Sequence, residues 1–152
     1  MLYKHSWSFL LSFGLILTAA LLVTGAAGPK TNTAGEIPPV PDPIPDNAVI
    51  FFEDINYGGH WFMYYNDRDN NDLRAIYVET DPKVNWNDRI SSLKVGKNVC
   101  VTFWQDIKYV GNKGSYAATG TSLMSVSSLV GPGWNDKISS LKIRLRDNCA
   151  KS

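Results

Sequence analysis

The sequence lacks the surplus of basic residues that binding to nucleic acid or to anionic lipid requires. The formal net charge is +1, and the single charged residue before Gly28 is Lys4, so the chain beyond residue 27 carries equal numbers of acidic and basic residues. Recognition of phosphate-rich partners depends on a positive field. The composition therefore argues against nucleic acid and anionic membrane surfaces as primary partners.

Residues that support catalysis are also scarce. The chain has two histidines, and His60 is the one that lies beyond the N-terminal segment. It follows Gly59 at the start of an expected strand, which favours a surface or cross-strand position. No nucleophile-elbow motif accompanies it, so a Ser-His-Asp triad has little support. No pair of carboxylates is singled out for glycoside hydrolysis either. We therefore expect that the protein is not an enzyme.

The N-terminal 27 residues have the pattern of a signal peptide. A short polar start with Lys4 precedes an apolar run over residues 7–23, and the small residues Gly25 and Ala27 follow at the spacing that a signal peptidase accepts. The alternative is an uncleaved anchor, because the run approaches the roughly 20 residues that span a bilayer. A membrane tether would then pass through residues 7–23. Both readings predict a secreted or cell-surface protein.

Cysteine is nearly absent, with two residues at positions 100 and 149. An even number of cysteines in an exported protein predicts one disulfide bond. A bond between Cys100 and Cys149 would close a loop of about 50 residues, which is worth roughly 4 kcal/mol in the chain-entropy model. Two cysteines without a nearby histidine are a poor zinc site.

A proline-rich segment separates the N-terminus from the rest of the chain. Residues 28–47 contain the stretch GEIPPVPDPIPD, whose five prolines favour extended polyproline II over helix or sheet. We interpret residues 28–47 as a linker. The folded domain is predicted to begin near Ala48 and to occupy residues 48–152.

The sequence beyond the linker is predicted to be all-β. It has no segment of ten or more residues with a convincing helical apolar period. Short runs rich in β-branched and aromatic residues are separated by Gly, Pro, Asn and Asp, which is typical of strands and turns. The residues of the polar stretch 119–133 have no clear assignment. Expected strands cover residues 49–53, 60–65, 75–79, 92–95, 99–104 and 140–146.

An internal repeat divides the domain into two similar halves. Residues 86–95 read WNDRISSLKV and residues 134–143 read WNDKISSLKI. Upstream of each copy, FFEDINYGG at 51–59 aligns with FWQDIKYVG at 103–111. Two units of about 50 residues therefore pack into a small β-sandwich. The matching tryptophans, Trp86 and Trp134, are expected to pack in the core and not to stack on a ligand.

The repeated Asn-Asp-x-x-Ser-Ser segments at residues 87–92 and 135–140 combine carboxylate, amide and hydroxyl oxygens. Calcium binds six to eight such oxygens. The alternative for either copy is an Asx turn that holds no ion. Two nearly identical copies favour calcium binding, because a simple turn would tolerate divergence.

The two clamp segments, each preceded by an aromatic-x-x-x-x-Tyr-x-Gly element, resemble the Greek-key motifs of microbial βγ-crystallins. The resemblance covers residues 48 to about 147, with motif one at 48–97 and motif two at 98–150. It implies a β-sandwich of two Greek keys that binds two calcium ions. Within this fold we expect the Cys100–Cys149 bond to join the first and last strands of motif two.

The resemblance implies which residues hold each ion. Each site would use main-chain carbonyls of a hairpin residue and of a clamp residue. It would also use the hydroxyl at the fifth position of one clamp and the carboxylate at the second position of the other clamp. The first site would contain Glu53, Arg89, Ser91 and Asp136. The second site would contain Gln105, Lys137, Ser139 and Asp88.

Motif two departs from motif one where Val110 replaces Gly58. If position 110 requires a positive φ angle, valine is unfavourable there and the site that uses Gln105 would be weaker. Two alternatives to calcium binding as the main role stay open. One is a secreted proteinase inhibitor that presents loops at 66–72 or 112–133. The other is an adhesion or carbohydrate-binding module that uses Tyr64 and Tyr65.

Overall fold

A computed structural model describes residues 37–76 and 85–151. The predicted signal segment 1–27, the alternative anchor 7–23 and the first part of the linker lie outside these residues. Within the described part of the chain, no helix is long and apolar enough to cross a membrane.

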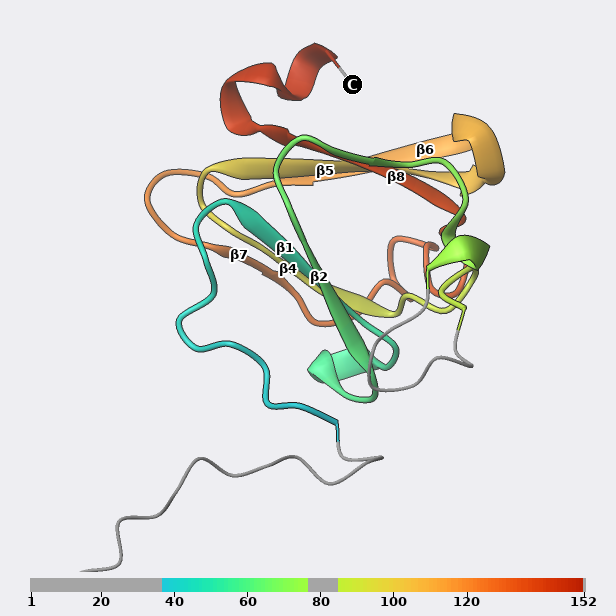
Figure 1. The fold of residues 1–152 in the computed structure, drawn as a ribbon, viewed down its shortest axis with the longest axis horizontal. Coiled ribbons are helices and arrows are strands. Elements are labelled where there is room, and N and C mark those ends of the chain that lie inside the picture. The colour runs from blue at the N-terminus through green and yellow to red at the C-terminus, as the bar shows by residue number, and fades with distance from the viewer. Residues whose placement is uncertain (1–36, 77–84, 152) are drawn as a thin grey trace, which may run out of the picture. The chain divides into compact units, whose positions relative to one another are not determined.

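The domain consists of two four-stranded antiparallel sheets and short 3-10 helices (Figure 1). The all-β prediction is therefore confirmed. The strands are β1 (Ala48–Phe52), β2 (Trp61–Tyr65), β3 (Arg68–Asn70), β4 (Ser92–Val95), β5 (Val99–Asp106), β6 (Val110–Ala117), β7 (Met124–Val126) and β8 (Ser140–Leu145). The 3-10 helices are η1 (Ile55–Tyr57), η2 (Leu73–Ala75), η3 (Ile107–Tyr109) and η4 (Arg146–Lys151).

Each motif contributes three neighbouring strands to one sheet and its third strand to the other. The strand order is β2-β1-β4-β7 in the first sheet and β3-β8-β5-β6 in the second. Motif two thus supplies β7 to the first sheet, and motif one supplies β3 to the second. The predicted sandwich of two Greek keys is confirmed, and the exchange of third strands joins the two halves.

The core lies between the sheets and is dominated by aromatic and β-branched side chains. All five residues of β1 are buried, and the first six residues of β5 are buried as well. Phe51 and Phe62 stack with ring centroids 4.7 Å apart, and Phe62 contacts Trp86 edge to face at 4.6 Å. Such residues form strands because they pack well on a pleated, half-buried surface. The strands expected from β-branched and aromatic runs at β1, β2, β4, β5 and β8 are present.

Four strand assignments differ from expectation. The strand expected at 75–79 is wrong at its start, because Leu73–Ala75 is the helix η2, and residues 77–79 lie outside the described residues. Strands β3, β6 and β7 were not predicted. β6 is mostly exposed and carries three polar side chains and two glycines, yet its main chain pairs with β5 over most of its length. Backbone pairing here does not need an apolar side-chain pattern.

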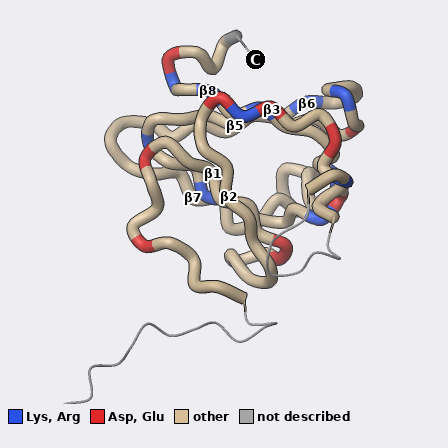
Figure 2. Tube along the Cα trace, viewed as in Figure 1, with Lys and Arg blue, Asp and Glu red and all other residues tan. Residues whose placement is uncertain are grey.

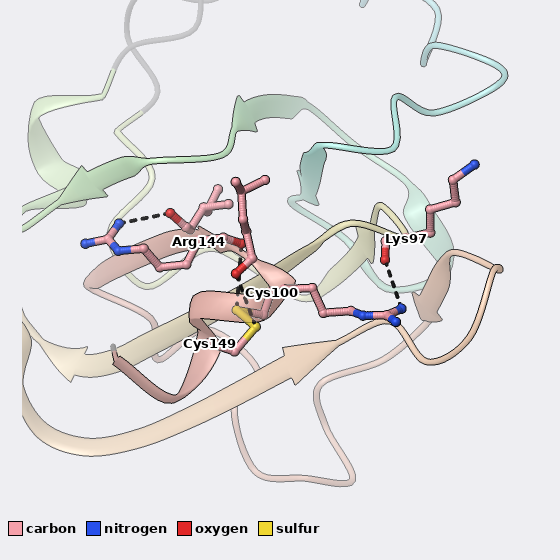
Figure 3. Close-up of a disulfide and its surroundings, with 7 residues drawn as sticks. Lys97, Cys100, Arg144 and Cys149 are labelled. Atoms are coloured by element: carbon pink, nitrogen blue, oxygen red, sulfur yellow. Dashed lines mark hydrogen bonds between the residues drawn. A yellow bond between two sulfur atoms is a disulfide. The ribbon is translucent and has the colours of Figure 1, made fainter.

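The predicted disulfide between Cys100 and Cys149 is present (Figure 3). Its expected location is partly wrong. Cys100 lies on β5, the first strand of motif two, but Cys149 lies in η4, after the last strand. The bond therefore fixes the C-terminal helix to the second sheet. Beside it, the Arg146 side chain donates a hydrogen bond to the Gly120 carbonyl over 2.7 Å.

The described part of the proline-rich segment lies against the domain. The Trp61 indole donates a hydrogen bond to the Pro38 carbonyl over 2.8 Å, and Asp46 forms a 2.6 Å ion pair with Lys97. Gly96 permits this contact, because a side-chain carbon there would lie 2.5 Å from the Pro45 carbonyl oxygen. Residues 37–47 are therefore seated on the fold.

Candidate metal centre

The two Asn-Asp-x-x-Ser-Ser segments form turns that lead into the last strand of each motif. We call residues 87–92 the first clamp and residues 135–140 the second clamp. Asp88 and Asp136 have φ angles of 55° and 53°, in the left-handed region that Asp and Asn tolerate better than most residues. In each clamp the preceding asparagine amide donates to the aspartate carboxylate, over 2.6 Å in the first and 2.7 Å in the second.

The carboxylate of each clamp aspartate reaches the clamp of the opposite motif. The Ser91 hydroxyl donates to Asp136 Oδ1 over 2.8 Å, and the Ser139 hydroxyl donates to Asp88 Oδ1 over 2.9 Å. Main-chain bonds set this register, because Asp88 N–H donates to the Ile138 carbonyl over 3.1 Å. The structure thus brings together the fifth-position hydroxyl and the opposing second-position carboxylate in both copies.

The sixth residue of each clamp has a separate structural task. Ser92 and Ser140 are fully buried. The Ser92 hydroxyl donates to the Asp54 carbonyl over 2.6 Å and accepts from the Tyr57 N–H over 3.1 Å. Ser140 makes the same pair of bonds to Asp106 and Tyr109. These serines anchor the hairpin to the clamp, a role that the sequence analysis did not assign.

The predicted carbonyl donors Glu53 and Gln105 lie beside the clamps. In motif one the Ser91 N–H donates to the Phe52 carbonyl over 3.0 Å, directly before Glu53. In motif two the Ser139 N–H donates to the Trp104 carbonyl over 3.0 Å, directly before Gln105. The hairpin and the clamp are therefore in register at both sites.

The first site opens into a small acidic hollow of about 240 Å³. All four residues predicted for this site line it. Oxygen-bearing groups predominate, and four of the lining residues are acidic. The lining consists of Glu53, Asp54, Asp88, Arg89, Ser91 and Asp136.

The Glu53 side chain adds a feature that the sequence did not predict. Its carboxylate forms an ion pair with Arg89 and a 2.7 Å contact with His60 Nδ1. Burial raises the pKa of Glu53, but hydrogen bonds from His60 and Arg89 together outweigh burial and hold the pKa below its usual value. Glu53 is therefore ionised at neutral pH. His60 occupies the surface strand-start position that we expected.

The second site adjoins a hollow of opposite charge. The Asn112 amide donates to the Gln105 side chain over 3.2 Å, and the Lys137 ammonium donates to the Gly133 carbonyl over 3.1 Å. Among the described residues that line this hollow, two are lysines and none is acidic. Charged residues of both signs lie on the strands of the second sheet, whereas Lys94 is the one charged residue on the strands of the first (Figure 2). The acidic residues of the first hollow therefore come from turns and not from strands.

The expected effect of Val110 is wrong. Its φ angle is −106°, close to the −93° of Gly58 at the matching position. The positive φ angles fall one residue later, at Gly59 and Gly111, with values of 71° and 82°. Valine is therefore unstrained at position 110 and does not weaken the second site.

The donor set determines which ions the clamps fit. Among the described residues, no group of three or more His, Cys, Asp or Glu side chains is arranged to hold a metal. An ion at either clamp would instead be held by one carboxylate together with hydroxyl and carbonyl oxygens. Such a hard-oxygen set suits calcium and does not suit zinc or copper.

No protein-family model and no curated protein matches the chain. Solved structures do match. A domain solved in work on the evolution of the eye lens βγ-crystallin domain fold is 23% identical, with a TM-score of 0.57, covering 70% of this chain and 94% of that one. A βγ-crystallin domain from Flavobacterium johnsoniae is 23% identical, with a TM-score of 0.50, covering 64% and 94%. One from Clostridium beijerinckii is 30% identical, with a TM-score of 0.49, covering 64% and 97%.

The exchanged third strands and the paired clamps define a two-motif Greek-key sandwich, and its structural matches are βγ-crystallin domains. The resemblance predicted from the sequence repeat is therefore confirmed. The chain has the βγ-crystallin fold.

Proposed function

We propose that the protein is a secreted or cell-surface domain that binds two calcium ions and is stabilised by them. The observation that carries this proposal is the reciprocal pairing of Ser91 with Asp136 and of Ser139 with Asp88. Two carboxylates are thereby held at defined positions beside hydroxyl and main-chain oxygens. We propose a binding domain and not an enzyme.

Each ion would connect the two motifs. Glu53, Arg89 and Ser91 of motif one would share the first ion with Asp136 of motif two. Gln105, Lys137 and Ser139 of motif two would share the second ion with Asp88. Water would complete the six to eight oxygens that calcium requires. Because an unfolded chain cannot assemble these sites, the binding free energy adds to the stability of the fold.

The first site is expected to bind calcium more tightly than the second. Its hollow contains Glu53 and Asp54 in addition to the clamp carboxylates. The Glu53 charge is partly offset by Arg89. The second hollow contains Lys113 and Lys137, whose positive charges oppose a divalent cation.

Thermal unfolding with and without calcium tests the proposal. The chain from residue 28 should gain roughly 10 °C in Tm at calcium concentrations about a hundredfold above Kd, because one such site adds about 2.7 kcal/mol. Asp136→Asn should remove most of the gain due to the tighter site, and Asp88→Asn should remove the smaller remainder.

Asp67→Asn is a matched control for both variants. Asp67 also has a positive φ angle, 59°, and its carboxylate also accepts from the preceding asparagine, Asn66, over 2.8 Å. It lies outside both clamps, so its substitution should leave the calcium gain unchanged. Absence of a thermal shift and of binding heat at millimolar calcium would refute calcium binding.

Export is tested separately from metal binding. Expression of the full chain, followed by fractionation and N-terminal sequencing, should yield an extracytoplasmic protein that begins near residue 28. Retention in the membrane with residues 7–23 intact would favour the anchor, and recovery of the intact chain in the cytoplasm would contradict both.

The inhibitor alternative gains no specific support, and neither does adhesion or carbohydrate binding through Tyr64 and Tyr65. The segments 66–72 and 112–133, expected to be loops that a protease could meet, contain strands β3, β6 and β7. Tyr64 packs edge to face on Phe62 with centroids 5.2 Å apart, so its ring is engaged within the fold.

A further inference from the structure

The two motifs differ at one aromatic position beneath the clamp tryptophan. Strand pairing makes the positions equivalent, because Phe51 lies opposite Phe62 in motif one and Phe103 lies opposite Gly114 in motif two. Motif two thus has a glycine where motif one has a phenylalanine. Trp134 is the repeat partner of Trp86.

The replacement of phenylalanine by glycine changes the exposure of the tryptophan that precedes the clamp. In motif one, Phe62 covers Trp86, whose ring is fully buried. In motif two, Trp134 contacts Phe103 edge to face at 4.8 Å but stays partly exposed. A side-chain carbon at Gly114 would lie 3.0 Å from the Trp134 ring, so the absence of a side chain at Gly114 allows the indole to pack closely against β6. The expectation of a buried core tryptophan holds for Trp86 and is incomplete for Trp134.

A hollow of about 500 Å³ lies beside the exposed part of Trp134. This volume falls within the range of small-molecule sites. The hollow lies between the β5–β6 hairpin and the loop that enters the second clamp. Its lining consists of Gln105, Asn112, Lys113, Pro132, Gly133, Trp134 and Lys137.

The polar groups around the indole are all suited to a polyhydroxylated anion. Lys113 and Lys137 supply ammonium groups, and Gln105 and Asn112 supply amides that both donate and accept hydrogen bonds. Lys137 uses one donor on the Gly133 carbonyl, which leaves further donors for a ligand.

We propose that this hollow binds an acidic sugar residue, with the ring on the Trp134 indole and the carboxylate between the two lysines. The amides would contact the sugar hydroxyls. A simple inorganic anion would use the lysines but neither the indole nor the amides. Motif one cannot form the same site, because Phe62 fills the space over Trp86 and Trp61 replaces Lys113.

The site is distinct from the proposed calcium site that it adjoins. Gln105 and Lys137 line the hollow, and the sugar would contact their side chains, whereas calcium would take their main-chain carbonyls. Sugar binding is therefore expected in chelator as well as in calcium. A failure of calcium binding in the thermal experiment would not contradict sugar binding. A failure of sugar binding would likewise not contradict calcium binding.

Binding of an oligogalacturonate trimer, measured by calorimetry in chelator at low and physiological ionic strength, tests the proposal. Lys113→Gln should weaken binding about tenfold, because it removes a charge-assisted hydrogen bond. Lys108→Gln removes the same charge from motif two at a residue that does not line the hollow, and should leave the affinity nearly unchanged. An uncharged galactose trimer should bind at least about tenfold more weakly than the acid.

Three results would overturn the proposal. The first is no binding of the acidic trimer at millimolar concentration. The second is equal weakening by Lys113→Gln and Lys108→Gln. The third is equal binding of a short polyglutamate, which would show that charge alone drives the association. Lys113 is exposed, so its substitution leaves the core intact, and unchanged thermal unfolding of the variant confirms this.

Discussion

The two motifs share one backbone and one clamp but differ in the side chains that surround it. Glu53, His60 and Arg89 of motif one correspond to Gln105, Asn112 and Lys137 of motif two. In both motifs the hairpin residue is tied to the residue after the glycine, by a contact of 2.7 Å in the first and 3.2 Å in the second. The connectivity is thus the same, while the charge around the site is reversed.

The shared residues are those that determine the shape of the turn. Lys94 and Lys142 each place an ammonium 4.5 Å from the centroid of the hairpin tyrosine, and Ser92 and Ser140 make matching bonds to the same hairpins. Of the residues that differ, Glu53 and Arg89 line the first hollow, whereas Gln105, Asn112 and Lys137 line the second. The two motifs therefore have similar turns but different side chains around them.

Removing Phe62 should produce the largest effect, because it gives motif one the opening found in motif two. Phe62→Ala deletes a 6% exposed ring that contacts Phe51, Tyr64 and Trp86, and should cost about 3–5 kcal/mol of unfolding free energy. Urea unfolding measures the loss. Tyr65→Ala on the same strand, at a 49% exposed residue, should cost within about 0.5 kcal/mol. Similar costs for the two variants would show that motif one does not depend on this aromatic cover.

Breaking the disulfide should affect motif two, the half in which both cysteines lie. Replacing Cys100 and Cys149 with alanine releases a link across 49 residues, which is worth up to about 4 kcal/mol. Urea unfolding under non-reducing conditions compares the variant with the parent. Amide exchange should show faster opening of β5 and η4 than of β1 and β2. Uniform acceleration across both motifs would contradict a local role.

Exchanging the hairpin residues should shift the predicted order of the calcium sites. Gln105→Glu gives the second site the carboxylate of the first and should tighten its calcium Kd about fivefold, or roughly 1 kcal/mol. Glu53→Gln should weaken the first site by a comparable factor. Calorimetric titration resolves the two steps. An unchanged calcium Kd in both variants would mean that the side chain at this position does not contribute to the electrostatic field at the ion.

The smallest expected effect concerns the strand that motif one contributes to the second sheet. Asp69 on β3 forms an ion pair with Arg144 on β8, and the hydrogen bond from Arg144 lowers the pKa of Asp69. This contribution is present above the ordinary aspartate pKa and is lost as pH falls through the lowered pKa. The pair is partly exposed and solvent-screened, so we expect at most about 1 kcal/mol.

Asp69→Asn should therefore reduce unfolding free energy at pH 7 and flatten its fall toward acid pH. Chemical denaturation at pH 7 and in steps below pH 4 measures both effects. Asp147→Asn, at an exposed residue in η4, serves as the control. If the unfolding free energy of Asp69→Asn falls toward acid pH as steeply as that of the parent, this ion pair does not stabilise β3.

The sequence predicted the strands whose side chains carry a clear apolar pattern. β8 alternates Leu141, Ile143 and Leu145 with Lys142 and Arg144, and its burial follows this alternation except at Leu145, which is exposed. β6 is an edge strand with mostly exposed side chains, and β7 has three residues, so neither has such a pattern. The repeat offered the missing signal, because β6 occupies the position in motif two that β2 has in motif one.

The clamp residues were predictable because two copies of one short segment are rarely retained for a turn alone. Their cross-motif pairing followed from the family resemblance and is visible in the Ser91–Asp136 contact. The charge of the surroundings was not predictable from the motif. Arg89 reaches Glu53 across 36 residues of sequence, and such a contact depends on the folded arrangement of hairpin and clamp.

The exchanged third strands have a consequence for synthesis on the ribosome. β3 pairs with β8, with Asn70 opposite Leu141, so motif one cannot complete its pairing until almost the whole domain has been made. Non-local pairings of this kind slow folding, because the loop must close before the contacts form. For the export that we propose, this delay would be useful. The first half would stay open while translation continues, and an open chain is the form in which a polypeptide can be threaded through a membrane pore.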